Sequence, residues 1–117
     1  MHNETILIVD DSESNIDILI EHLIDYEVVV SLNATDALTL LEEQTIDLIL
    51  LDIMMPDIDG FELCKLIKEN PKTQEIPLLF ITSKSDEESI EKGYDLGAVD
   101  YITKPFKPKE LRSRIKT

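Results

Sequence analysis

Five polar residues of this chain stand directly after four short apolar runs. Asp10 and Asp11 follow residues 6–9, Asp52 follows 46–51, Thr82 follows 78–81, and Lys104 follows 101–103. Each run predicts a β-strand, and ligands of open parallel α/β sheets bind beyond the carboxyl ends of the strands. We therefore expect these five side chains, far apart in sequence, to meet at one small site. Three carboxylates, a hydroxyl and an ammonium group suit a divalent cation together with a phosphoryl group.

The aspartate pair at positions 10 and 11 would mean little alone, because adjacent acidic residues usually lie in a solvated loop. Its position after a buried strand, with Asp52 expected at the same edge of the sheet, favours a metal site instead. Carboxylates held close together repel one another, and a bound hard cation such as Mg²⁺ offsets this repulsion.

Asp52 is better interpreted as a phosphoryl acceptor than as a metal ligand alone. The loop after it has Met54, and so no second chelating side chain, two residues further on. A carboxylate can attack a phosphoryl group and form an aspartyl phosphate. Lys104 would supply a point charge and Thr82 a hydroxyl donor to the negative charge that spreads over the phosphoryl oxygens.

Amphipathic helices separate the apolar runs and must position these residues. Apolar residues recur at helical spacing in 16–24 and 34–41, and further helices are expected at about 60–70, from 85 to about 97, and from 108. The expected start signals are Ser14 with Asp17, Asn33, Asp59 with Glu62, Ser85 with Glu88, and Pro108. Five repeats of strand then helix, with a short strand at 28–30, predict a parallel sheet covered on both faces.

Length and charge restrict the classes of function. The chain has 117 residues, enough for one domain, with a net charge of −14. That charge argues against direct binding of nucleic acid or an anionic membrane surface, because both require basic patches. Cys64 is the only cysteine and lies on an apolar helix face, so a buried, reduced thiol is expected. Residues 1–4 have no basic stretch typical of a secretory signal, and no apolar run approaches the length that spans a bilayer, so a cytoplasmic setting is expected. The last expected helix has no stop signal, so we expect residues 1–117 to be one domain of a longer protein.

The motifs together resemble the receiver domain of two-component response regulators. The resemblance covers essentially the whole chain and lies in Asp10-Asp11, the segment 51–60 (LDIMMPDIDG), Thr82-Ser83, and the segment 101–106 (YITKPF). It implies a flavodoxin-like, CheY-like (βα)5 fold with strand order 2-1-3-4-5. It also implies a switch, not a conventional enzyme, that catalyses its own phosphorylation and dephosphorylation.

The resemblance implies a role for each site residue. Asp52 would accept a phosphoryl group from a phosphohistidine of a sensor histidine kinase or a histidine phosphotransfer protein. Mg²⁺ would be held by Asp10, Asp11, Asp52 and the backbone carbonyl of Met54. Thr82 and Lys104 would bind the phosphoryl oxygens. The side chain of Tyr101 would rotate inward as Thr82 moves toward the phosphoryl group. The Lys104-Pro105 peptide bond would be cis.

Some positions depart from the family pattern. Lys107 stands where a capping Ser or Thr is common before the last helix. Met54 and Lys84 stand two residues after Asp52 and Thr82, at positions that tune phosphoryl lifetime in the family. An apolar Met54 would not orient an attacking water, so a moderate to slow loss of the phosphoryl group is expected. Asp100, Glu110 and Arg114 are similar to the charged dimer face that many transcriptional members form from the fourth helix, fifth strand and fifth helix. The match is partial, because Ile90 and Val99 are uncharged, and a solvated surface is the alternative.

Two other classes of protein fit less well. A haloacid-dehalogenase-type phosphatase uses similar residues, but its nucleophile stands in a D-x-D motif and its acidic pair comes last, whereas here position 54 is Met and the pair comes first. A dinucleotide-binding domain needs a glycine-rich first turn, and residues 11–14 have none. A receiver fold that no longer takes phosphate is disfavoured by the complete five-residue set.

Overall fold

Strands and helices alternate five times along the chain. The computed structural model describes residues 4–53, 55, 58–82, 87–103 and 107–116. The elements are β1 (Thr5–Val9), α1 (Glu13–His22), β2 (Glu27–Ser31), α2 (Ala34–Glu43), β3 (Leu48–Leu51), α3 (Gly60–Glu69), β4 (Leu78–Thr82), α4 (Glu87–Asp95), β5 (Asp100–Thr103) and α5 (Pro108–Lys116). The alternation expected from the sequence is confirmed.

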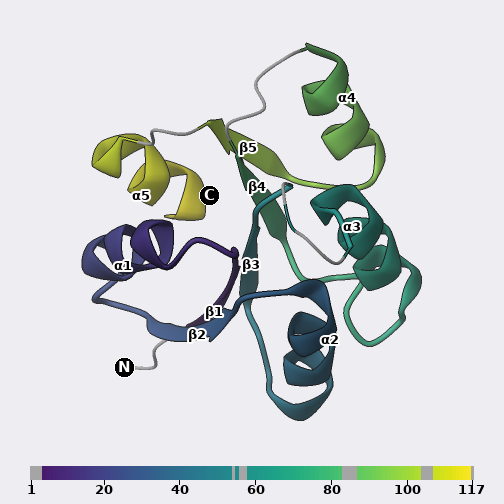
Figure 1. Ribbon diagram of the computed structural model, residues 1–117, viewed down its shortest axis with the longest axis horizontal. Coiled ribbons are helices and arrows are strands. Elements are labelled where there is room, and N and C mark those ends of the chain that lie inside the picture. Colours follow the sequence, from purple (N-terminus) through teal and green to yellow (C-terminus); the bar gives the residue numbers. More distant parts are fainter. Residues whose placement is uncertain (1–3, 54, 56–57, 83–86, 104–106, 117) are drawn as a thin grey trace.

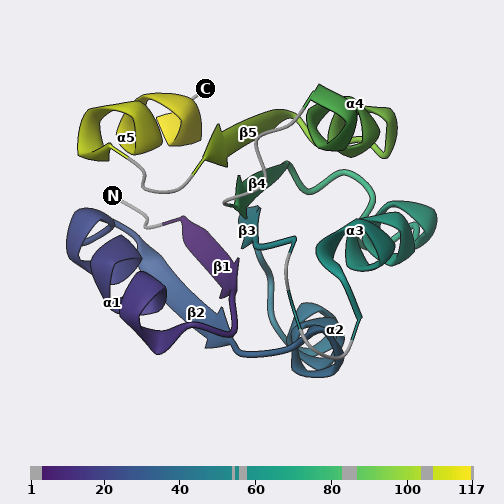
Figure 2. The same ribbon diagram turned by 45° about the horizontal axis from the view of Figure 1, so that its top comes forward.

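The five strands form one parallel sheet in the order β2-β1-β3-β4-β5 (Figure 1). This is the flavodoxin-like order 2-1-3-4-5. Helices α1 and α5 cover one face of the sheet, and α2, α3 and α4 cover the other (Figure 2). In the described part of the chain no helix is both long and apolar enough to cross a bilayer.

The core lies in two layers, one on each side of the sheet, because successive strand residues point to opposite faces. In β1, Leu7 and Val9 pack toward α2 and α3, while Ile6 and Ile8 pack toward α1 and α5. All four residues of β3 are buried. Strands that are apolar on both faces are typical of the centre of a parallel sheet.

The helix boundaries agree with the sequence in most places. Asn33 caps α2 by accepting the backbone N–H of Asp36, and Asp59 caps α3 by accepting that of Glu62. Pro108 occupies the first position of α5, directly after the exposed Lys107. The predicted start of the fourth helix at Ser85 lies outside the described residues.

The predicted boundaries of the first helix were wrong. Its N-cap is Ser12, not Ser14, because the Ser12 side chain accepts the backbone N–H of Asn15. The helix ends at His22, so Ile24, expected on its apolar face, lies beyond it and is 82% exposed. The third strand is also shorter than expected and begins at Leu48 instead of Ile46.

Lys68 ties the end of α3 to the loop that leads into β4. Its ammonium group donates hydrogen bonds to the backbone carbonyl oxygens of Gln74 (3.2 Å) and Ile76 (2.9 Å). It also lowers the pKa of Cys64, but burial dominates and raises the pKa of this thiol to about 11. Cys64 is therefore the neutral, buried core thiol that its position on α3 predicts.

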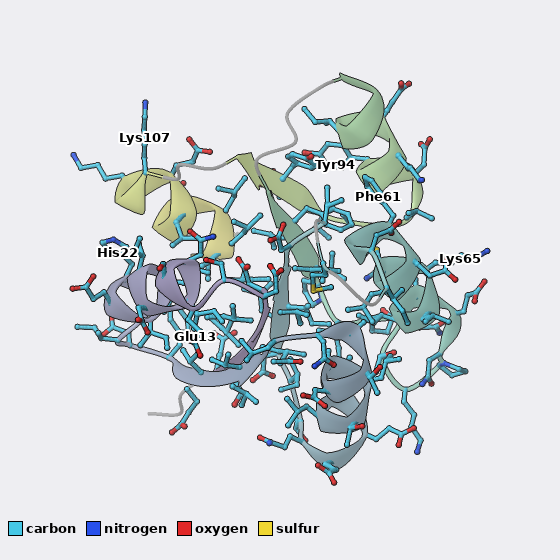
Figure 3. All side chains as sticks on the ribbon, in the orientation of Figure 1. Glu13, His22, Phe61, Lys65, Tyr94 and Lys107 are labelled. Carbon is cyan, nitrogen blue, oxygen red and sulfur yellow. The ribbon has the colours of Figure 1, made fainter. Side chains whose placement is uncertain are left out.

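We expect Lys68→Met to lower the free energy of unfolding by about 2 kcal/mol, because two carbonyl groups lose a charged donor. Lys65→Met is the matched control, since Lys65 lies on the same helix but is exposed and points away from the domain (Figure 3). Urea unfolding of both variants measures the difference. Equal unfolding midpoints for the two variants would contradict a structural role for Lys68.

Candidate functional site

Three carboxylates meet at the carboxyl ends of β1 and β3. One oxygen from each of Asp10, Asp11 and Asp52 lies within 4.8 Å of the others. Asp10 and Asp52 are only 2% and 5% exposed, whereas Asp11 is exposed. The convergence of these three side chains, expected from the strand ends, is therefore observed.

The pairing of neighbouring strands sets this convergence. β1 and β3 are paired in register with Val9 opposite Leu51, so the next residue on each strand is an aspartate. The backbone N–H of Asp52 donates to the carbonyl oxygen of Val9 (2.9 Å), and that of Asp10 donates to Ser31 on β2 (3.1 Å). Both acidic residues are thus fixed by the sheet itself.

Ser12 fixes the orientation of the Asp10 side chain, a role that the sequence analysis missed. The backbone N–H of Ser12 donates to Oδ1 of Asp10 at 2.9 Å, closing a local turn at the start of α1. An aspartate followed two residues later by a capping serine is the usual signature of such a turn. The same serine therefore starts the helix and orients a site carboxylate.

Gly60 allows the start of α3 to lie against the backbone of Asp52. A Cβ atom at position 60 would lie 2.4 Å from the carbonyl oxygen of Asp52 and 2.6 Å from Cα of Ile53. The backbone N–H of Gly60 donates to the carbonyl oxygen of Ile53 (2.8 Å). This helix start therefore supports the loop that follows Asp52, and only glycine fits there.

The other expected site residues are described in part. Thr82 is the last residue of β4, and its backbone pairs with Thr103 on β5, so it reaches the same edge of the sheet as Asp52. Its side chain, Met54, and the Lys104-Pro105 bond lie outside what the structure describes. His22, expected to take no part, is half-buried at the opposite end of α1 from the aspartates (Figure 3).

Tyr101 lies in a row of aromatic rings on the face covered by α3 and α4. Its side chain is 7% exposed, and its ring is tilted against that of Phe80 with the centroids 6.1 Å apart. Phe80 in turn meets the edge of Phe61 at 5.4 Å, and the ammonium group of Lys92 lies 4.7 Å from the Phe61 centroid. Phe61 lies between α3 and α4 (Figure 3), so the row links Tyr101 to both helices.

The chemistry of the carboxylate cluster suits a hard divalent cation. Two buried carboxylates and an exposed third within 4.8 Å concentrate negative charge where little water screens it. Oxygen ligands of this kind are those that Mg²⁺ prefers, completed by water molecules. A bound cation would offset the repulsion and prepare the site for an anionic phosphoryl group.

Known proteins share both the sequence and the fold. The family model for the response regulator receiver domain matches residues 6–116. A protein of Vibrio cholerae named as a probable cyclic di-GMP phosphodiesterase is 45% identical over 97% of the chain, and the transcriptional regulatory protein PhoP of Bacillus subtilis is 40% identical over 97%. The chain spans only 26% and 48% of the lengths of these two relatives. The solved structure of the Vibrio cholerae chemotaxis protein CheY4 superposes with a TM-score of 0.92, covers 98% of each chain, and is 29% identical.

We expect Gly60→Ala to cost roughly 1–3 kcal/mol of folding free energy, because the added Cβ meets backbone atoms that cannot rotate away. Gly93→Ala is the comparison, since its Cβ would lie 3.0 Å from atoms of the Phe80 ring, a longer contact with a side chain and not with the backbone. Urea unfolding of the two variants tests this difference. A smaller loss for Gly60→Ala than for Gly93→Ala would show that the loop after Asp52 is not held by the start of α3.

Proposed function

Because this chain belongs to the response regulator receiver domain family of two-component systems, we propose that it is a phosphorylation-controlled switch whose phosphoacceptor is Asp52. The observation that carries the proposal is the meeting of Asp52 with Asp10 and Asp11 within 4.8 Å at the carboxyl edge of the sheet. Of the three, Asp52 alone follows the central strand β3, and the other two follow the neighbouring strand β1.

The transfer is a displacement at phosphorus. A carboxylate oxygen of Asp52 attacks the phosphoryl group of a phosphohistidine on a sensor kinase or a histidine phosphotransfer protein. The new O–P bond forms as the N–P bond breaks, and the electron pair of that bond returns to the imidazole nitrogen. The backbone hydrogen bond from Asp52 to Val9 on β1 helps to hold the attacking carboxylate in place. The entropy of ordering this group is therefore lost when the protein folds and not during the reaction.

Asp10, Asp11, Asp52 and the backbone carbonyl of Met54 are the proposed ligands of Mg²⁺. When bound, Mg²⁺ supplies positive charge against the phosphoryl oxygens, the main electrostatic requirement of such a transfer. The Thr82 hydroxyl donates to one of these oxygens and the Lys104 ammonium group to another. Thr82 ends β4, and Lys104 follows β5 in the sequence; both strands lie on the side of β3 away from β1, which supports an approach from that side.

Phosphorylation is proposed to act on the surface formed by α4, β5 and α5. Thr82 and Tyr101 lie on paired strands, and Tyr101 packs against Phe80, the partner of Leu51 on β3. A shift of Thr82 toward the phosphoryl group would therefore change the space available to the Tyr101 ring. Tyr94 and Val99 are 46% and 57% exposed on this surface, which supports a homodimer there.

The setting of the switch is also proposed. A cytoplasmic location is proposed for the domain. The greater length of the two relatives supports a parent protein in which residues 1–117 control a further domain.

Asp52→Asn should abolish phosphorylation by acetyl phosphate, because an amide cannot attack the phosphoryl group. Asp47→Asn is the matched control, since Asp47 lies at the other end of the same strand and is exposed. EDTA should suppress phosphorylation of the wild type by removing the divalent cation. The measurement is the mass increase of the intact protein, and phosphorylation of Asp52→Asn at the wild-type level would overturn the assignment.

The phosphoryl group should be lost over minutes or longer, because the apolar side chain of Met54 cannot orient an attacking water. The decay of phosphorylated protein in the presence of Mg²⁺ measures this lifetime. Met54→Asn, which places a polar group at that position, should shorten it. Loss from the wild type within seconds would contradict the role given to Met54.

A further inference from the structure

A groove of about 400 Å³ crosses the amino edge of the sheet, at the opposite end of the strands from the carboxylate cluster. Its rim includes the residue that directly precedes each strand: Glu4, Tyr26, Asp47, Pro77 and Val99. The groove therefore spans all five strands. Five strands about 4.8 Å apart make it roughly 19 Å long, the length of a helix of about 13 residues.

The floor of the groove is apolar. Ile6, Leu48 and Leu79 belong to the core layer beneath α1 and α5, and Ile115 packs against that layer from the last turn of α5. Helices α1 and α5 cover this core layer but leave it open at the amino edge of the sheet, where the groove lies. Its volume lies within the range of pockets that bind ligands, and it has room for the side chains of one helix face.

The rim of the groove is acidic. Glu4, Asp47 and Asp100 contribute carboxylates, and none of the described lining residues is a lysine, arginine or histidine. Asp47 accepts the backbone N–H of Thr5, and Asp100 accepts that of Tyr101. The hydroxyl of Tyr94 also donates to the Asp100 carboxylate at 3.3 Å. These hydrogen bonds hold both carboxylates at the rim of the groove.

We propose that this groove is a docking site for a basic amphipathic helix of a partner protein. Leucine-like side chains on one face of the helix would fill the apolar floor, and lysine or arginine residues beside them would meet Glu4, Asp47 and Asp100. Charge complementarity selects this partner: lysine or arginine side chains would be attracted to the three rim carboxylates, whereas two copies of the chain meeting groove to groove would set these carboxylates against each other. The site is at the opposite edge from Asp52, so docking requires neither Mg²⁺ nor phosphorylation.

The test uses a synthetic helical peptide of about 14 residues with leucines on one face and lysines along both sides. Titration into the ¹⁵N-labelled protein should shift the amide signals of Glu4, Tyr26, Asp47 and Val99 and leave those of Asp10 and Asp11 unchanged. The same peptide with glutamate in place of lysine should not bind. Shifts spread over the whole surface, or equal binding of the acidic peptide, would overturn the proposal.

Two matched pairs of variants distinguish binding in the groove from a general attraction of the basic peptide to the negatively charged protein. Glu4→Lys should weaken peptide binding about fivefold at low ionic strength, while Glu69→Lys, the same charge change at an exposed position on α3, should leave it within about twofold. Val99→Ser should also weaken binding, while Ile24→Ser, which removes an apolar side chain that is 82% exposed, should not. Equal losses within either pair would refute a groove-specific site.

The remaining measurements separate this inference from the proposed function. Binding should be the same with and without EDTA and in Asp52→Asn, so loss of phosphorylation leaves the docking result intact. Sedimentation of the protein at the titration concentration identifies a competing occupant. A dimer that Glu4→Lys dissociates would assign the groove to a second copy of the chain and overturn the helix proposal.

Discussion

The in-register pairing of β1 with β3 is the constraint on which the rest of the site depends. It places Asp10 and Asp52, one residue beyond Val9 and Leu51, side by side at the edge of the sheet. The backbone hydrogen bonds that create the sheet therefore also force like charges together in a poorly solvated position. The burial of many apolar side chains on the two faces of the sheet stabilises the fold and offsets this repulsion. A cation bound between these carboxylates would offset their mutual repulsion directly.

The sequence predicted those parts of the structure that depend on periodicity. Apolar runs bounded by helical stripes indicated the sheet, and the strand order came from the family resemblance and was confirmed. The convergence of the three aspartates followed from a general property of parallel sheets, and needed no knowledge of individual contacts. Asn33 and Asp59 were recognisable as helix caps because capping depends on a hydrogen bond to a residue only three positions away.

The sequence could not show features that depend on contacts across the fold. Ser14 fitted a helix start in the sequence, and only the bond from the Asn15 N–H to the Ser12 side chain shows that Ser12 is the cap. Gly60 looked like the first residue of a helix, while its main constraint is the backbone of Asp52, eight positions earlier. Nothing in the sequence around Lys68 indicated that its ammonium group bonds carbonyl groups of the next loop. Each of these roles arises from the distance between elements, which local patterns do not encode.

The shortness of the strands has a mechanical consequence. β5 has four residues, which at about 3.3 Å each span roughly 13 Å between the two edges of the sheet. It is also the last strand in the order, with β4 as its single neighbour in the sheet. A segment this short, paired in the sheet with one strand, tilts as a stiff rod more readily than it bends. Any tilt that moves Thr103 at one end also moves Val99 at the other, so the two edges of the sheet are connected by a lever that needs no chain of intermediate side-chain rearrangements.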